Sequence, residues 1–464
     1  MKPKIIYILL LVTLISIKAN AQESFQFTLQ EAVEYAMSNQ VNIKNAELDK
    51  EIAKQKVRET VAIGLPQIDG KASIQNFLDI PTQVLPDFIS PAVYGTLVKE
   101  GVIDGNGNPI QMPTSFGSTP VQFGTNFNMS YGIDISQLIF DGNYLLGLKA
   151  ASVYKDLSIK ALKRSKIETQ VNVSKAYYNV LVAQKNIELL DANIVQLKKT
   201  LDDTKAYYDQ GFVEKIDIDR LNVLYNNLVT ERENISRIVD LSKVLLKFQM
   251  GMPIASKLEL KDKLEDVVLQ QNLNSEEGVN LEGRVEFQLL KTQMRLNELD
   301  YKRNIVNRAP SLVAFGSFSR NGLSNEFSTL TDVFYPTSII GLQLNVPILG
   351  SGKKYYQTKQ AKLNLEKSKN DLKNLENALS LESKSANVTF NNSVNSLNNQ
   401  RKNMDLASEI LRVSKAKYEQ GVGSSIEVVT AQTSLKEAET NYINALFNAL
   451  VAKIELEKSK GNIQ

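Results

Sequence analysis

The sequence predicts an internally duplicated chain that combines a membrane β-barrel with long coiled-coil α-helices, each copy of the chain supplying four strands. Three observations predict this mixed fold class. One segment alternates apolar and polar residues for about 17 positions, helical stretches run for about 67 residues, and the order of elements in the first half of the chain returns in the second. The length of 464 residues by itself suggests about two or three domains.

The composition excludes several classes of function. The chain contains no Cys and no His, which excludes thiolate nucleophiles, Ser-His-Asp triads and nearly all zinc or copper sites. Its 54 basic and 51 acidic residues leave a formal net charge of only +3, so there is no broad positive field for nucleic acid. A carboxylate-based hydrolase needs two acids at a fixed distance, whereas the acids here are spread along helix faces. We therefore expect no enzyme, no cofactor, no metal and no nucleic-acid partner.

The first segment predicts a secretory signal peptide at 1–21. Lys2 and Lys4 precede an apolar run at 5–17, and Ala19 and Ala21 place small residues where a signal peptidase cleaves. The alternative is a membrane anchor, but about 13 apolar residues fall short of the roughly 20 that a spanning helix needs. No later segment approaches 18 consecutive apolar residues, so the mature chain could cross a membrane only as a closed β-barrel.

The duplication is clearest at two helix turns. KAYYDQG at 205–211 returns as KAKYEQG at 415–421, which places Gly211 and Gly421 at equivalent positions. The segments GIDISQLIFDGN and GLQLNVPILGSG, which precede the long helices, recur at nearly the same offset. A repeat of this length indicates a duplicated half-molecule. The predicted parts are a first repeat at 22–250, a connector at 251–283 that is expected to form an equatorial region, and a second repeat at 284–464.

Each repeat is expected to contain a helix, two strands and two long helices. In the first repeat, a capping box at Thr28 and Glu31 begins a helix that runs to about Ala62 and is stopped by Pro66. Its strands are predicted at 67–78 and 123–140, and its long helices at 144–210 and 214–250. The second repeat is predicted to begin with a helix at 284–308. Its strands are predicted at 311–320 and 338–349, and its long helices at 353–420 and 425–458. The Pro/Gly-rich stretch 79–121 is predicted to be a long loop.

The strand at 123–140 carries the clearest periodicity. Its odd positions hold Phe, Met, Tyr and Ile, whereas its even positions hold Gly, Asn, Ser and Asp, and a period of two places these sets on opposite faces. The alternative is a half-buried strand on a soluble core, but such strands average about 5–6 residues. Four strands cannot close a barrel, because the smallest outer-membrane barrels use about eight and open edges in lipid leave backbone groups unpaired. Several copies must therefore share one barrel.

The long helices are predicted to pack as coiled coils. Leu365, Leu372 and Leu379 are spaced by seven residues within a stretch rich in Lys, Glu, Asn and Ser. A helix of about 67 residues is roughly 100 Å long, which no globular core requires. The alternative, a soluble fibrous coiled coil, explains these helices but not the strands or the duplication.

Together these features resemble the outer-membrane factors of the TolC type over essentially the whole mature chain. The resemblance depends on the twofold repeat, the Leu65-Pro66 and Ala309-Pro310 entries into the strands, the FDG and LGSG exits, and the YDQG and YEQG turns. It implies a homotrimer with a twelve-stranded barrel in the outer membrane and a helical barrel in the periplasm. It also implies two partners, a periplasmic adaptor protein and an inner-membrane transporter.

The resemblance further implies a gate at the periplasmic tip. The pore-lining acid of the family, six residues after the second turn glycine, matches Glu427, whereas a second acid three residues later corresponds to Thr430. The family's tyrosine matches Tyr418, its acid after the first turn matches Asp217, and its linking arginine is replaced by Gly423. An ordinary solvated helix face is the alternative for these side chains.

The helix turns are the candidate docking tip for an adaptor: Gly211 and Gln210 in the first repeat, and Gly421 and Gln420 in the second. We expect the whole protein to be the outer-membrane channel of a tripartite efflux pump or a type I secretion system in a Gram-negative bacterium. It would be a passive export conduit surrounded by outer-membrane lipid. The alternative is a soluble periplasmic coiled-coil scaffold or adaptor.

Overall fold

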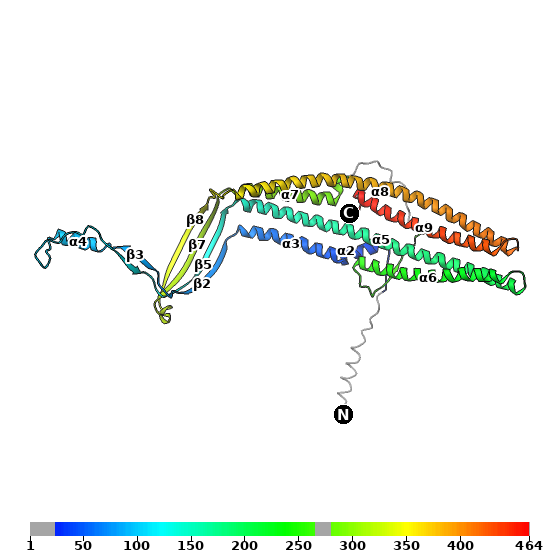
Figure 1. Cartoon of the computed structure of the whole chain (residues 1–464), viewed down its shortest axis with the longest axis horizontal. Coiled ribbons are helices and arrows are strands. Elements are labelled where there is room, and N and C mark those ends of the chain that lie inside the picture. The colour runs from blue at the N-terminus through cyan, green and yellow to red at the C-terminus, as the bar shows by residue number, and fades with distance from the viewer. Residues whose placement is uncertain (1–23, 265–279, 464) are drawn as a thin grey trace, which may run out of the picture. The chain divides into compact units, whose positions relative to one another are not determined.

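The computed structural model describes residues 24–264 and 280–463 (Figure 1). The predicted signal peptide and part of the predicted connector lie outside the described residues. The chain divides into two compact units. The helical unit comprises the described parts of Met1–Val57, Ala150–Tyr301 and Lys359–Gln464, and the sheet unit comprises Arg58–Lys149 and Lys302–Thr358.

Four strands form one antiparallel sheet in the sheet unit, in the order β2–β5–β7–β8. They are β2 (Gln67–Asn76), β5 (Phe127–Phe140), β7 (Ser311–Ser324) and β8 (Phe334–Asn345). The strand ends differ from the predicted ones. β5 begins after Gly124, whose φ of +143° interrupts the extended chain. β8 lies four residues earlier than predicted, because Pro347 lacks the N–H that a continuing ladder would need.

The register gives the sheet one apolar and one polar face. Cross-strand partners share a face, so Ile68, Ile135, Gly316 and Ile340 form one apolar row across the four strands. Ile340 is 81% exposed, so this face is uncovered in the single chain. The opposite face holds further rows, among them Asp69, Asp134, Ser317 and Ile339, and Lys71, Gly132, Ser319 and Thr337. The alternation predicted for two strands therefore extends across much of the sheet. Val313, Phe315 and Ile339 on the polar face and Arg320 on the apolar face are exceptions.

The N-terminal helix is broken, which corrects the prediction of one helix from Thr28 to Ala62. The capping box is present, since the Glu31 amide donates to Thr28 Oγ1 at 3.2 Å and the Thr28 amide donates to Glu31 Oε2 at 2.8 Å. It starts α2 (Leu29–Asn39), and α3 (Val41–Ile63) follows. Between them Gln40 adopts extended backbone, with ψ at 127°, and its side chain accepts the Asn42 amide.

The long helices lie where the periodicity predicts them. They are α5 (Gly142–Asp209) and α6 (Lys215–Met250) in the first repeat, and α8 (Lys353–Glu419) and α9 (Ser425–Lys460) in the second. The shorter α7 (Val285–Val306) follows the turn η2 (Leu281–Gly283). α6 and α9 end at equivalent left-handed glycines, Gly251 and Gly461.

In the helical unit each long helix lies beside its partner from the same repeat, α6 along α5 and α9 along α8 (Figure 1). Each pair has its own apolar core. The α5–α6 core contains Leu190, Leu197, Leu201, Leu221 and Leu228, and the α8–α9 core contains Ala407, Leu411, Tyr418, Val428, Ala431 and Leu435. A third cluster joins α2, α5, α6 and α9 to a small parallel sheet of β1 (Ser24–Phe27) and β6 (Lys257–Leu260).

The stretch 79–121, which was predicted to be a long loop, contains secondary structure of its own. This stretch contains β3 (Thr82–Pro86) paired with β4 (Ser118–Gln122), and the helix α4 (Ser90–Lys99) between them. The connection between β7 and β8 contains only the single turn η3 (Phe327–Thr329). Across the described ranges, no helix is both long and apolar enough to cross a membrane.

Candidate functional site

The two helix turns, both in the helical unit, have the same backbone. Gly211 and Gly421 have φ of +80° and +71°, the left-handed region that side chains with a Cβ disfavour. The Phe212 amide donates to the Tyr207 carbonyl at 2.9 Å, and the Val422 amide donates to the Lys417 carbonyl at 3.0 Å. The glycine is therefore required by the reversal itself in both repeats.

Each turn presents one polar and one apolar side chain to solvent. Gln210 and Gln420 precede the glycines and are exposed, as expected. Phe212 and Val422 follow the glycines and are also strongly exposed. Sequence reasoning missed this apolar pair, although both follow the turn glycine and could have been found by comparing the two repeats.

Polar side chains join the first-repeat pair, α5 and α6, to the second-repeat pair, α8 and α9. We call this set of contacts the seam. Its cross-links are Thr204–Tyr418, Asp217–Ser425, Asn193–Gln432, Asn193–Glu439, Glu231–Lys436 and Lys175–Glu455. Val429 adds an apolar contact to the α5–α6 core. Near the turns, apolar cores hold each pair together and hydrogen bonds and ion pairs supply most of the contacts between the pairs; farther from the turns, Ile443, Leu446 and Leu450 of α9 join the third apolar cluster with α5 and α6.

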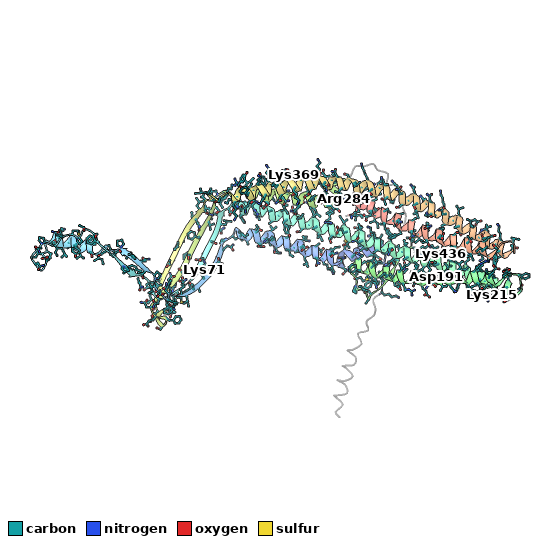
Figure 2. All side chains as sticks on the ribbon, in the orientation of Figure 1. Lys71, Asp191, Lys215, Arg284, Lys369 and Lys436 are labelled. Carbon is teal, nitrogen blue, oxygen red and sulfur yellow. The ribbon has the colours of Figure 1, made fainter. Side chains whose placement is uncertain are left out.

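The deepest cross-links of the seam centre on Asn193, which is buried. The Gln432 amide donates to Asn193 Oδ1 at 3.1 Å, and the Asn193 amide donates to Glu439 Oε2 at 2.6 Å. Burial raises the pKa of Glu439, although the Asn193 hydrogen bond acts in the opposite direction. Lys436, labelled on α9 in Figure 2, forms its ion pair with Glu231 one helical turn from Glu439.

The seam closes near the turns with Tyr418 and Asp217, two of the predicted site residues. The buried Tyr418 hydroxyl donates to Thr204 Oγ1 at 3.2 Å. Burial raises the pKa of Tyr418, and the negative charge of Asp217 adds to this effect. The Ser425 hydroxyl donates to Asp217, which also accepts the Glu214 amide at 3.2 Å at the start of α6.

Glu427 is placed differently from its first-repeat equivalent, Asp217. It lies in the first turn of α9 and is exposed. Within the described part of the chain, no hydrogen bond or ion pair engages its carboxylate. The structure therefore brings Asp217 and Tyr418 into the seam and leaves Glu427 outside it.

The seam also has a signal in the sequence. Ser425, Gln432 and Glu439 recur every seven residues on α9, and Val428 and Leu435 lie between them on the same helical track. Polar residues at core positions of a coiled coil specify its register and its oligomeric state. The apolar members of this track pack on α8, and the polar members contact α5 or α6.

The fold and sequence match known outer-membrane channels. The family model described as Outer membrane efflux protein matches residues 286–462. The outer membrane protein TolC of Vibrio cholerae is 22% identical over 341 residues, 72% of this chain and 77% of that one. The TolC of Escherichia coli is 23% identical over 353 residues, 73% of this chain and 71% of that one. The Campylobacter jejuni CmeC outer membrane channel superposes with a TM-score of 0.73 at 16% identity, covering 94% and 86% of the two chains.

Residues 286–462 match the outer membrane efflux protein family, and the two TolC relatives extend the similarity to 72% and 73% of the chain. The resemblance seen in the sequence is therefore confirmed, as is the outer-membrane location with the helical part in the periplasm. The family is one of channels rather than enzymes, and these matches do not favour the soluble scaffold or adaptor.

The region near α7 contains a clamp that is built on one arginine. Arg284, labelled in Figure 2, is buried. It donates to both carboxylate oxygens of Glu382 at 3.1 Å and to the Ser459 carbonyl at 2.8 Å, which joins the start of α7 to α8 and to the end of α9. In the described residues no three acidic side chains converge to hold a metal ion.

Proposed function

We propose that this outer membrane efflux protein is a passive export conduit whose wall is shared among three copies of the chain. The observation that carries the proposal is the pair of open edges of the four-stranded sheet, β2 and β8. In lipid each unpaired backbone group costs several kcal/mol, so both edges need partner strands. Since β2 and β8 run antiparallel, β8 of one copy can continue the ladder on β2 of the next, and three copies give twelve strands.

The two faces of the sheet support a lipid-facing and a water-facing side. β8 has 12 residues, which exceeds the 9–11 that a tilted membrane strand needs. The uncovered Ile, Leu and Phe side chains suit hydrocarbon, and the opposite face carries a polar network. There, Asp134 accepts hydrogen bonds from Lys71 at 2.5 Å and from Ser317 at 2.7 Å. Such a network suits a water-filled lumen.

The helical unit would continue the conduit through the periplasm. α5 has 68 residues and α8 has 67, each roughly 100 Å long. The part of the seam near the turns is the proposed moving part, because there each pair has its own apolar core and can keep its fold when the pairs separate, while the third cluster holds the pairs together farther from the turns. Tyr418 and Asp217 would hold the closed state, and three copies of Glu427 would place negative charge on the axis and attract cations.

The proposed partners are a periplasmic adaptor and an inner-membrane transporter that supplies the energy. The adaptor would dock at the turns, where Gln210 and Gln420 offer hydrogen bonds. Phe212 and Val422 offer apolar contact beside them. Their exposure in both repeats would give a trimer six similar contact points.

Two measurements test the conduit. Native mass spectrometry of the purified mature protein in detergent should give three chains per particle, and planar lipid bilayers should show discrete conductance steps. Heat-dissociated protein serves as the control in the bilayer experiment. A stable water-soluble monomer that never inserts into bilayers would refute the proposal.

A further inference from the structure

An arm of about 48 residues, 78–125, leaves the sheet between β2 and β5 and contains β3, α4 and β4 (Figure 1). At its base the Phe77 amide donates to the Asn126 carbonyl at 2.7 Å, so β2 and β5 remain paired up to the point where the arm begins. A short hairpin loop could join these strands. The arm is therefore not needed to connect the sheet.

The interior of the arm is too small to stabilise it. Tyr94 of α4 contacts Phe116, with ring centroids 6.2 Å apart, but α4 has no buried residue. Phe88 is 69% exposed, and Ile89 and Val93, one helical turn apart on one side of α4, are 61% and 49% exposed. An isolated helix of ten residues is marginal in water. α4 therefore needs a surface to pack against.

The charge of the arm indicates what kind of surface this is. Residues 77–126 contain five charged side chains, namely Asp79, Asp87, Lys99, Glu100 and Asp104, whereas 23% of the whole chain is charged. A surface so poor in charge and so rich in exposed apolar groups marks an interface. Four anions against one cation disfavour the anionic headgroups of a membrane surface.

We propose that the arm packs on the neighbouring copy of this chain and clasps adjacent subunits together. The inference rests on the proposed function, in which β2 of one copy pairs with β8 of the next. The arm starts where the edge strand β2 ends, and β8 starts at the same end of the sheet because the two strands run antiparallel. The neighbour's β7–β8 connection therefore lies beside the base of the arm, and it exposes Phe327, Val333 and Tyr335.

The clasp fits this geometry better than it fits a contact within one chain. Within the chain, the base of the arm touches the β7–β8 connection on the β5 side, where the Asn126 amide donates to Asn325 Oδ1 at 3.3 Å and Phe127 contacts Phe327. Val333 and Tyr335, next to the open β8 edge, remain exposed. In the proposed trimer this edge lies next to the arm of the adjacent subunit.

Two sets of variants test the clasp in the full-length protein. The first replaces 79–124 by Asn-Gly, which leaves a four-residue loop between Phe77 and Asn126. The second carries Ile89→Ser and Val93→Ser, with Val98→Ser, an exposed valine on the opposite side of α4, as the matched control. We expect both arm variants to remain trimeric and conducting, but to dissociate in detergent at a temperature lower by about 5 °C or more, and the control to be unchanged.

Labelling provides a second readout, because the chain contains no Cys. A single Val93→Cys in the purified trimer should react with a maleimide several-fold more slowly than Asn106→Cys at the tip of the arm. Equal labelling rates, or unchanged dissociation temperatures, would overturn the clasp. Protection of position 93 only in cells, or only in lipid, would also overturn it, since the occupant would then be another partner or the membrane. A monomeric protein would instead refute the proposed function itself.

Discussion

Removing two hydrogen bonds of the seam should open the conduit at its turns. The variant is Tyr418→Phe with Ser425→Ala. Phenylalanine keeps the ring of Tyr418 in the α8–α9 core and removes only its bond to Thr204. The Thr204 hydroxyl still donates to the Thr200 carbonyl at 2.8 Å, and Asp217 still accepts the Glu214 amide, so neither remaining partner is left unsatisfied.

The expected size follows from the type of bond. A neutral hydrogen bond contributes about 1 kcal/mol and one to a charged group about 1.5–3 kcal/mol, which gives roughly 2.5–4 kcal/mol per chain for the two. Since 1.4 kcal/mol is a factor of ten, the balance between closed and open turns should move by about two to three powers of ten. The apolar cores of both helix pairs remain intact, so the trimer should stay folded.

Single-channel conductance in planar bilayers measures this effect. We expect the double variant to occupy a larger conductance level for most of the recording, with unchanged far-ultraviolet circular dichroism. The matched control is Tyr208→Phe, because Tyr208 is the first-repeat equivalent of Tyr418 and is exposed, with no hydrogen bond to its hydroxyl within the described residues. Identical conductance of parent and double variant would refute the idea that these contacts hold the turns closed.

Three further results are expected. Glu427→Ala should weaken the block of the conductance by multivalent cations. The control is Asp219→Ala, which removes an exposed acid near the first turn and should leave the block unchanged. Equal block in the two variants would show that Glu427 does not line the lumen. Gly251→Ala should lower the free energy of unfolding by about 2 kcal/mol or more, because its Cβ would lie 2.7 Å from a backbone oxygen at a φ of +70°. Gly211 has open space around it, so Gly211→Ala should lower the free energy of unfolding by only about 1 kcal/mol. Equal losses in the two variants would contradict the close approach at Gly251. Glu439→Gln should stabilise the protein at neutral pH, since the raised pKa of Glu439 means that the fold disfavours the charged carboxylate. This advantage should vanish as the pH falls into the range in which an ordinary glutamic acid is protonated. Thermal melts of both proteins across pH measure whether the variant is the more stable one at neutral pH.

The long elements of the fold could be predicted because their periodicity extends over many residues. The alternation through β5 and the heptads of α8 each repeat often enough to identify the element. The break at Gln40 could not be predicted in this way. It depends on a side chain that accepts a hydrogen bond from the backbone two residues later. It also lets Gly251 approach so closely that a Cβ on Gly251 would lie within 3 Å of backbone atoms of Asn39 and Gln40.

The arm and the β1–β6 pair were missed for a different reason. α4 has ten residues and β1 has four, so neither shows more than a few periods. β1 pairs with β6 more than 200 residues away along the chain, a contact that no local pattern encodes.

The candidate site was predicted only in part. The turn glycines and Tyr418 and Asp217 are identified by position within the repeat, so the family pattern could transfer them. Which polar side chains meet across the seam depends on how two helix pairs are rotated against each other. The heptad of Ser425, Gln432 and Glu439 gave the direction of the contact but not the identity of Asn193 as its partner.

The polar side chains of the seam determine which kind of surface would be exposed if the helix pairs separated. When two leucine-lined surfaces separate in water, they expose apolar side chains, which adhere to any other apolar surface nearby. Amides, hydroxyls and carboxylates instead exchange one another for solvent molecules of similar bonding strength. If the pairs separate near the turns as proposed, this part of the wall could be wetted and dried repeatedly, and each opening would be reversible without an exposed apolar surface.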